Sequence, residues 1–180
     1  MSNTNCLFLP EQIEIEINEN RDNYLLRLYQ ILINDFKISQ PLFKGFRVGW
    51  RRNPLVNAPG EVYHNREEAF HHLTTKEVDK KSKKREFDYE RCKRVSWAKP
   101  VIVNYCCKRD CCTNRIVTWN DSKIKNRLKI FFPEERYIII LDKRKTMDAI
   151  TQDYNEYYVL VTAYYIDIEH EYQKYLSKIT

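Results

Sequence analysis

Residues 157–168 constrain the fold more than any other part of the sequence, because they form its strongest strand signal. The segment is rich in Val, Thr and Tyr, which are residue types that favour β-strands. Three earlier segments are also predicted to be strands, namely residues 115–119, 127–132 and 136–142. Four strands in succession predict an antiparallel sheet that is built mostly from the second half of the chain.

Helices are predicted on both sides of these strands in the sequence. Apolar residues recur at helical spacing from Tyr24 to Phe36, with Asn20 available as a cap and Pro41 ending the helix. Similar spacing predicts a C-terminal helix over residues 168–179. The expected fold class is therefore α+β, with an N-terminal helix packed on an antiparallel sheet of about four strands in the second half and a C-terminal helix after it.

The remaining segments are assigned in less detail. Alternation of Ile13, Ile15 and Ile17 with polar residues predicts a short, half-buried strand. Residues 43–50 are predicted to be extended, residues 61–75 mix strand and short-helix signals, and residues 76–94 indicate a loop leading into a helix. The 180 residues suit a single domain. Its expected parts are an N-terminal strand and helix (1–40), basic loops and a helix (41–114), and the sheet with the C-terminal helix (115–180).

Charge is distributed unevenly along the chain, whose net charge is +6. Residues 41–133 contain 22 of the 31 Lys and Arg residues and 10 of the 25 Asp and Glu residues, a net charge of +12. The segments on either side, 1–40 and 134–180, each carry −3. A basic centre with acidic ends predicts one positive face and favours a polyanionic partner such as RNA or DNA. Taken alone, the basic run at residues 80–85 also fits a flexible, solvated loop.

Several common function classes lack their sequence signatures. The three glycines, Gly45, Gly49 and Gly60, cannot form a P-loop or a GxGxxG fingerprint. Neither HExxH nor GxSxG occurs. No apolar run is long enough to span a membrane, and no charged-then-apolar leader begins the sequence. We therefore expect a soluble, cytoplasmic protein with no membrane partner.

The cysteines are concentrated in one short segment. An intracellular chain rarely builds a disulfide framework, so a metal site is the alternative to consider. Zinc sites usually divide their ligands between two separated pairs, whereas this segment forms one group that Cys92 or a histidine would have to complete. The pattern favours a thiol-rich surface turn over a metal site, and no cofactor is expected. The weak candidate ligands are Cys106, Cys107, Cys111 and Cys112.

Two adjacent histidines, His71 and His72, lie between apolar residues, so we expect one imidazole to point inward and the other outward. Imidazole has a reference pKa near neutrality, which suits general acid–base catalysis. An ordinary structural role is the alternative. The sequence alone does not decide which of the two histidines would act.

The last predicted strand offers two hydroxyl groups beside several cations. Regular alternation places Tyr158, Leu160, Thr162, Tyr164 and Ile166 on one face of the sheet. The hydroxyls of this set can orient a phosphate or make ordinary cross-strand hydrogen bonds. Metal-free cleavage of RNA needs a base, a cation and an acid, which a basic sheet face with one histidine can supply. The cations that could project onto this face are Arg127, Lys129, Lys143 and Arg144.

The order of these motifs resembles the barnase–EndoU–colicin–RelE-like ribonuclease superfamily, in particular its phage- and toxin-associated branches. The shared features are an N-terminal helix, a His-Leu-Thr element at residues 72–74 and a sheet whose last strand is similar to Tyr-x-Leu-x-Thr-Ala-Tyr, here residues 158–164. The chain also resembles a bacterial family of about this length. The motifs shared with it include Phe-x-Gly-x-Arg-x-Gly at residues 43–49 and Glu-Arg-x-x-x-Val-x-Trp-x-x-Pro at residues 90–100.

This resemblance covers most of residues 24–180 and implies a metal-independent endoribonuclease. Attack of the 2′-hydroxyl would leave a 2′,3′-cyclic phosphate, and the protein would be the toxin or effector of a toxin–antitoxin or phage-defence system. Its implied partners are RNA and an acidic antitoxin or inhibitor protein. The implied catalytic residues are His72, with His71 as the alternative, Arg127 and Arg144 as phosphate clamps, and Thr162 and Tyr164 as orienting groups. The implied RNA-binding residues are Arg91, Arg94, Lys129 and Lys143.

Two other functions fit the same sequence. A non-catalytic nucleic-acid-binding module would use His72 structurally and stack its tyrosines on single-stranded bases. A phage or host protein-interaction inhibitor would use exposed tyrosines with Trp50 or Trp97 as a protein-binding patch. Salt dependence separates these two alternatives, because each phosphate contact makes affinity fall as the salt concentration rises.

Overall fold

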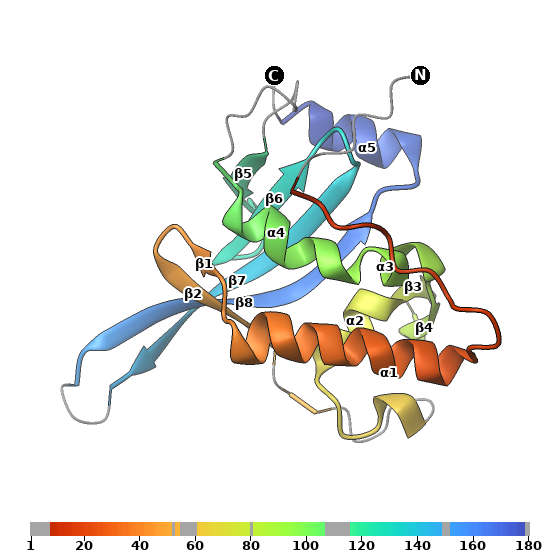
Figure 1. Cartoon of the computed structure of the whole chain (residues 1–180). Coiled ribbons are helices and arrows are strands. Elements are labelled where there is room, and N and C mark those ends of the chain that lie inside the picture. Colours follow the sequence, from red (N-terminus) through yellow and green to blue (C-terminus); the bar gives the residue numbers. More distant parts are fainter. Residues whose placement is uncertain are drawn as a thin grey trace.

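The computed structural model describes residues 8–51, 53–54, 61–79, 81–106, 116–148 and 152–178. Its main sheet has six strands: β1 (Leu42–Phe43), β2 (Phe46–Trp50), β5 (Val117–Asn120), β6 (Arg127–Phe132), β7 (Tyr137–Met147) and β8 (Tyr154–Tyr165). The spatial order is β1-β2-β8-β7-β6-β5 (Figure 1). Every neighbouring pair is antiparallel except β2 and β8, which run parallel.

The expected α+β fold with a helix near each end is confirmed, but the sheet is larger than predicted and is mixed. The four predicted strands correspond to β5, β6, β7 and β8, and the first half of the chain adds β1 and β2. Strand β2 pairs with part of the outer edge of β8 and buries Val48 and Trp50. An uncovered edge of β8 would leave unpaired backbone groups, which β2 satisfies. Local strand patterns do not reveal such a pairing, because its partners are more than 100 residues apart in the chain.

The N-terminal helix α1 (Arg21–Leu32) continues into a π-helical segment, η1 (Ile33–Ile38). As predicted, Asn20 caps its first turn, where its side chain accepts a hydrogen bond of 2.9 Å from the Asn23 amide. Its buried side chains follow the predicted apolar spacing and pack into the main core. They are Tyr24, Leu25, Leu28, Leu32 and Phe36.

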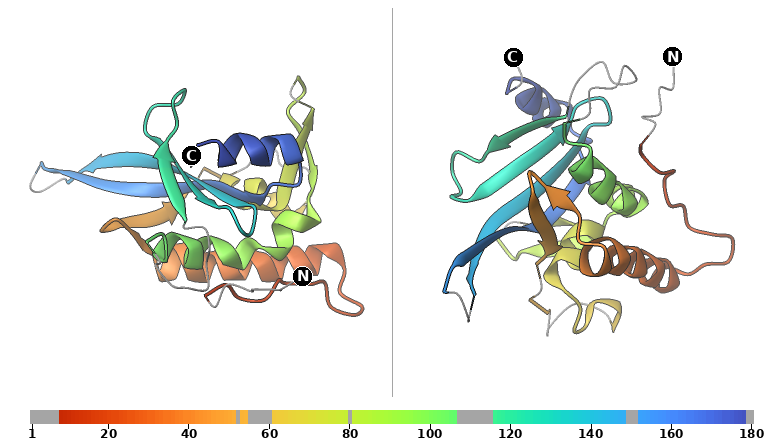
Figure 2. Two further views of the ribbon diagram at one scale, coloured as in Figure 1. Left: turned by 90° about the horizontal axis from the view of Figure 1, so that it is seen from above. Right: turned by 60° about the vertical axis from the view of Figure 1, so that its left-hand side comes forward.

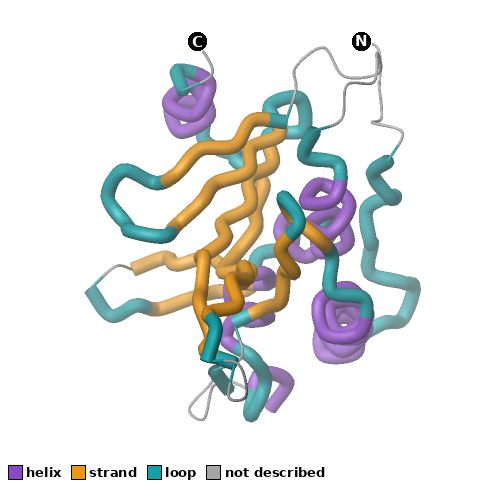
Figure 3. The backbone as a smooth tube through the Cα atoms, turned by 90° about the vertical axis from the view of Figure 1, so that its left-hand side faces the viewer, coloured by secondary structure: helices purple, strands orange, loops and turns teal. Residues whose placement is uncertain are grey.

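The sheet separates two unequal layers. Helices α1 and α4 (Ala98–Val103) cover one face, while α5 (Glu169–Leu176) covers one end of the other (Figures 2 and 3). The main core lies on the first side and contains alternate residues of the strands, such as Ile130, Ile139 and Leu160. A smaller cluster around Phe131, Ile138 and Ile166 lies under α5. The rest of the second face is left without a covering helix, and it carries the polar residues considered below.

A second small sheet lies beside the end of β8. Its two strands, β3 (Thr75–Asp79) and β4 (Lys84–Phe87), form a hairpin between α2 (Glu68–Thr74) and α3 (Tyr89–Lys93). The predicted loop at residues 76–94 is therefore partly a hairpin, although the helix expected after it is present. Short 3₁₀ turns, η2 (Glu61–Tyr63) and η3 (Val95–Trp97), complete this region.

The strand predicted from Ile13, Ile15 and Ile17 is wrong, because residues 11–16 have no regular secondary structure. The segment is held instead by contacts to helices. The Ile13 amide donates to the Lys93 carbonyl at 2.9 Å, and the Tyr24 hydroxyl donates to the Ile13 carbonyl at 2.6 Å. Since these contacts satisfy the backbone of Ile13, no partner strand is needed.

A β-bulge in β8 changes which of its residues share a face. Ile140 of β7 is opposite Thr162, but the next residue, Leu141, is opposite Leu160, so Val161 is the extra residue. Such a bulge reorients the side chains beyond it. Leu160 accordingly packs in the main core, whereas Tyr164 packs in the cluster under α5. The predicted shared face of Tyr158, Leu160, Thr162, Tyr164 and Ile166 is therefore wrong for Tyr158 and Leu160, which both pack in the main core.

Within the described residues, no helix combines the length and the apolar character needed to cross a bilayer.

Candidate functional site

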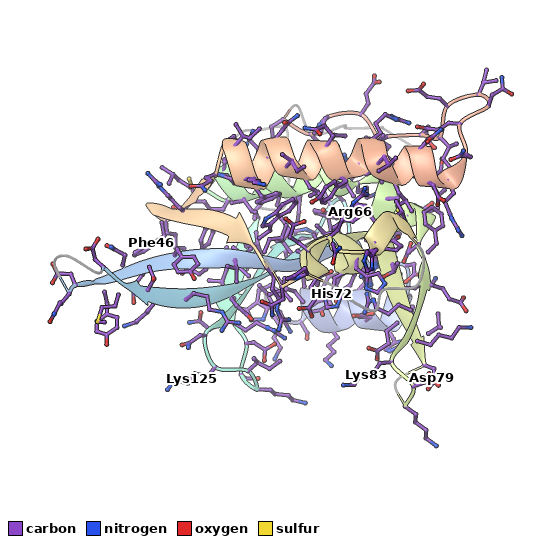
Figure 4. The ribbon with its side chains drawn as sticks, turned by 90° about the horizontal axis from the view of Figure 1, so that it is seen from below. Phe46, Arg66, His72, Asp79, Lys83 and Lys125 are labelled. Atoms are coloured by element: carbon purple, nitrogen blue, oxygen red, sulfur yellow. The ribbon has the colours of Figure 1, made fainter. Side chains whose placement is uncertain are left out.

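Helix α2 places His72 in an open cleft of about 540 Å³, where α2, α3, the β3–β4 hairpin and the end of β8 meet. Figure 4 shows His72 near the middle of the molecule, between the β7–β8 ribbon and the hairpin that carries Asp79 and Lys83. Four of the predicted site residues line this cleft together, although they come from three separate elements. They are His72, Arg91, Thr162 and Tyr164.

The main chain of His72 is held by two of these residues. Its carbonyl oxygen accepts a hydrogen bond of 3.1 Å from Thr162 Oγ1 and another of 3.0 Å from Arg91 Nη1. Both donors belong to elements other than α2, so the histidine is tied to β8 and α3 at once. The imidazole itself stays free of these contacts, and the side chain is 24% exposed.

The imidazole of His72 lies next to Glu68, one helical turn earlier. The distance from His72 Nε2 to Glu68 Oε1 is 3.7 Å, and Arg51 Nε lies 3.1 Å from the other carboxylate oxygen, Oε2. Glu68 therefore links the histidine to an arginine at the end of β2. Glu68 was not among the residues predicted from the sequence, although its (i, i+4) spacing to His72 on a helix is a recognisable signal.

Burial and nearby positive charge keep His72 neutral. Burial, together with repulsion of the protonated form by Arg85, His71, Arg51 and Arg91, lowers the pKa of His72 to about 4. At neutral pH the imidazole therefore has one ring nitrogen available to accept a proton. An anion that neutralises the arginines would raise this pKa, because it would remove part of the repulsion.

The two histidines point in different directions, as expected for adjacent residues. His71 is 8% exposed and packs edge-on against Tyr63, with 4.9 Å between ring centroids. It lines a different depression from His72, and its Nε2 has no hydrogen-bond partner among the described residues. Burial, aided by Arg85, lowers the pKa of His71 to about 4. The geometry therefore favours His72 over His71 as the acid–base group.

Both arginines of the cleft are held by polar contacts. Arg85 donates to the Thr75 side chain at 2.9 Å and to the Thr75 carbonyl at 2.7 Å. Arg91 lies with its guanidinium carbon 4.7 Å from the centre of the Tyr164 ring. From the sequence, Arg85 was predicted only as part of the basic run at residues 80–85, which fits a solvated loop. The β3–β4 hairpin brings it to the cleft, so no local pattern would have identified it.

The cleft also contains acidic side chains, for which the sequence resemblance suggested no candidate. They come from the hairpin, from α3 and from the region of α5. Asp88 is paired with Arg91 at 3.3 Å, and Glu90 is paired with Lys93 and Arg94. The cleft therefore has mixed charge rather than a purely basic lining. Its acidic residues are Glu77, Asp88, Glu90, Asp167 and Glu171.

The hydroxyl groups predicted to orient a phosphate already contact protein groups. Thr162 donates to the His72 carbonyl, as described above. The Tyr164 hydroxyl lies 3.4 Å from a Glu171 carboxylate oxygen and 3.2 Å from the Tyr175 hydroxyl. Burial raises the pKa of Tyr164 well above its usual value. Thr162 is thus positioned to fix the histidine, while Tyr164 joins the cleft to α5.

The other predicted cations do not line the His72 cleft. Arg127 and Arg144 share one carboxylate, Asp142, at 2.8 and 3.3 Å. Lys129 is paired with Asp121 at 2.7 Å, near α5. Lys143 and Arg94 have other surroundings: Lys143 lies over the Phe46 ring, and Arg94 is 8% exposed between the Trp97 and Tyr165 rings.

Only the first residue of the cysteine segment lies within the described residues. Cys106 is an exposed free thiol and Cys92 is a buried one, while Cys107, Cys111 and Cys112 lie outside the described residues. In the part of the chain that the structure describes, no three His, Cys, Asp or Glu side chains are grouped so that they could hold a metal ion.

The stability of the protein is expected to fall on acidification, because both histidines have lowered pKa values. For His71, a pKa of about 4 in the folded state, against about 6.5 in the unfolded state, means that the unfolded chain binds more protons between these values. The unfolding free energy therefore decreases as the pH falls from 6.5 to 4. Between pH 7 and pH 5, His71 alone accounts for about 2 kcal/mol.

Urea unfolding at pH 7 and pH 5 checks this expectation. The His71→Gln variant should lose about 2 kcal/mol less than the wild type over this interval. His170→Gln makes the same substitution at an exposed position on α5 and is the matched control. An equal pH dependence in wild type and His71→Gln would contradict a buried neutral imidazole at position 71.

We compared the chain with protein-family models, with curated proteins and with solved structures, and none of the three searches found a significant match. Membership of the ribonuclease superfamily therefore stays a prediction. The function is inferred from the chemistry and geometry of the residues described above.

Proposed function

We propose that this protein is a metal-independent endoribonuclease that uses His72 as its acid–base group. The observation that carries the proposal is the neutral, partly exposed imidazole in an open cleft beside Arg85 and Arg91. A neutral imidazole can take a proton, and the arginines can stabilise negative charge that develops on a phosphate. The resemblance of the motif order to the ribonuclease superfamily supports the same reaction.

The proposed reaction begins with the 2′-hydroxyl of RNA. His72 takes its proton, the 2′-oxygen forms a bond to phosphorus, and the bond from phosphorus to the 5′-oxygen breaks. The departing 5′-oxygen takes a proton from a water molecule in the open cleft, and the hydroxide that is left takes the proton from His72, which restores the neutral imidazole. The products are a 2′,3′-cyclic phosphate and a free 5′-hydroxyl, and the atoms balance without an added cofactor.

Substrate binding would adjust the basicity of His72 to this role. In the free protein its pKa is about 4, which makes the imidazole a weak base. A general base works best when its pKa lies near the working pH. A phosphate bound to Arg85 and Arg91 would offset their charge and raise the pKa of His72 toward neutrality. The histidine would thus become an effective base only beside a bound phosphate.

The biological setting that we propose is a cytoplasmic toxin or effector of a toxin–antitoxin or phage-defence system. This part of the proposal rests on the resemblance of the motif order. A cell that makes such an enzyme needs an inhibitor, and an acidic antitoxin would suit the exposed arginines. The inhibitor would act by covering the RNA-binding surface.

Incubation of the purified protein with total RNA and transfer RNA in the presence of EDTA tests the proposal. The expected result is cleavage that leaves cyclic phosphates and 5′-hydroxyls, as mapped at the product ends. Salt-sensitive binding of RNA without cleavage would instead support the non-catalytic nucleic-acid-binding module. If the protein neither binds nor cleaves RNA, the superfamily resemblance has no functional meaning.

A further inference from the structure

A second cleft, of about 610 Å³, lies on the same sheet face as Thr162. It is formed where β2, β7 and β8 run side by side, at the base of the ribbon that β7 and β8 extend beyond the rest of the molecule (Figure 1). Its charged lining differs from that of the His72 cleft. The charged side chains that line it are three arginines, Arg47, Arg51 and Arg144, and its lining includes no Asp or Glu among the described residues.

Two features of this second cleft suit a nucleotide. Arginine side chains bind phosphate through charge-assisted hydrogen bonds. Tyr157, the cross-strand neighbour of Arg144, also lines the cleft and provides an aromatic ring on which a base can stack. Arg47 is exposed and has no ion-pair partner among the described residues, so it is available to a ligand.

Gly49 leaves the necessary space. It lies in β2 and lines the cleft, and a Cβ atom built on it would meet no other atom within 4 Å. Its backbone does not require glycine, because its φ angle is not in the left-handed region. A side chain at this position would therefore project into the open space of the cleft.

The two clefts are connected through Glu68, which contacts a lining residue of each. Arg51 lines the second cleft and is paired with Glu68, whose other oxygen lies beside His72 Nε2. Along β7, Arg144 is four residues from Ile140, the residue opposite Thr162. Four residues correspond to about 13 Å of strand, so the two clefts suit neighbouring parts of one extended ligand rather than a single phosphate.

We propose that the second cleft binds the phosphate and base of a nucleotide beyond the two that flank the scissile phosphate at His72, so that the substrate is a single-stranded RNA spanning both clefts. This inference rests on the proposed ribonuclease function. It reassigns Arg144 from a clamp on the scissile phosphate to a ligand of a neighbouring phosphate. The strand must be unpaired, because a base within a duplex is stacked on its neighbours and cannot reach Tyr157.

The test compares binding and cleavage in three variants. Gly49→Val places a branched side chain in the cleft, and Arg144→Ala removes one of its cations. Lys145→Ala is the control: it removes the same charge from the next residue, whose side chain faces the other side of the strand. The binding probe is a single-stranded DNA hexanucleotide, which cannot be cleaved through a 2′-hydroxyl. The cleavage substrates are an RNA dinucleotide and an RNA hexanucleotide. Thermal unfolding confirms that each variant is folded.

Arg144→Ala is expected to weaken hexanucleotide binding by about tenfold, the effect of losing a charge-assisted contact, and Gly49→Val is expected to weaken it because the added side chain takes up space in the cleft. Dinucleotide cleavage should be unchanged in both variants, and Lys145→Ala should resemble the wild type. Arg144→Ala should also reduce the salt dependence of binding by about one phosphate contact. Unchanged hexanucleotide affinity in Gly49→Val and Arg144→Ala, or no binding by the wild type, would overturn the inference.

The binding arm separates this inference from the proposed function. Suppose that the wild type binds the hexanucleotide, that both variants bind it more weakly, and that the wild type cleaves neither RNA. The second cleft is then a nucleotide site, and the ribonuclease proposal fails. If the wild type cleaves both RNAs at equal kcat/KM and the variants bind normally, then the ribonuclease proposal stands and the second cleft is not a subsite.

Discussion

Replacing His72 with alanine is expected to lower the rate of RNA cleavage by about 10²–10⁴-fold, the usual contribution of a general acid–base group. The imidazole is the group in the cleft that burial and neighbouring arginines keep neutral at physiological pH. In the proposed reaction, its loss removes the base that takes the 2′-hydroxyl proton. The measurement is kcat/KM for an RNA oligonucleotide in the presence of EDTA, with the product ends mapped.

Two further variants make this result specific. His170→Ala, on the exposed surface of α5, should cleave at the wild-type rate. Glu68→Gln keeps the shape of the side chain next to His72 but removes its charge, and should shift the pH profile of cleavage rather than abolish activity. Equal activity of His72→Ala and wild type would remove His72 from the mechanism.

Truncating Phe70 to alanine is expected to lower the free energy of unfolding by about 3–5 kcal/mol, the usual cost of deleting a buried aromatic side chain. Phe70 is fully buried, with ring centroids of Tyr29 and Tyr63 at 5.0 and 5.5 Å. It belongs to α2, two residues before His72, and anchors this helix against α1. Urea denaturation followed by tryptophan fluorescence measures the loss.

The matched control is Ile17→Ala, which removes an apolar side chain that is 94% exposed. Its effect should stay within about 0.5 kcal/mol, because no packing is lost. A loss below about 1 kcal/mol for Phe70→Ala would mean that α2 is not packed on the core as described. Cleavage by Phe70→Ala should fall along with its stability, since α2 carries the site.

The proposed chemistry depends on two different charge environments on one sheet face. The His72 cleft combines arginines with several carboxylates, so it can tune a titrating group. The second cleft has arginines without a lining carboxylate among the described residues, so it is better suited to hold a phosphate that does not react. The basic centre of the sequence predicted a positive face; of its cations, Lys76, Arg85 and Arg91 line the His72 cleft, and Arg47 and Arg51 line the second cleft.

The helices and strands with the clearest local patterns could be predicted from the sequence. The apolar spacing of α1, the cap at Asn20, and strands β6 and β8 depend on side chains within one element. The alternation or helical spacing of apolar residues indicates which side of an element is buried, because apolar residue types favour burial. The adjacent histidines were identified as candidates for the same reason, since their chemistry is visible in a single segment.

Only the tertiary structure decided how these elements combine into a site. The parallel pairing of β2 with β8, the bulge at Val161 and the hairpin that carries Arg85 all depend on partners distant in the sequence. The different surroundings of His71 and His72 also depend on long-range packing, because one imidazole packs against Tyr63 and the other faces a cleft. Residue types determine what chemistry is available, whereas long-range packing determines which groups meet and how strongly burial shifts their pKa values.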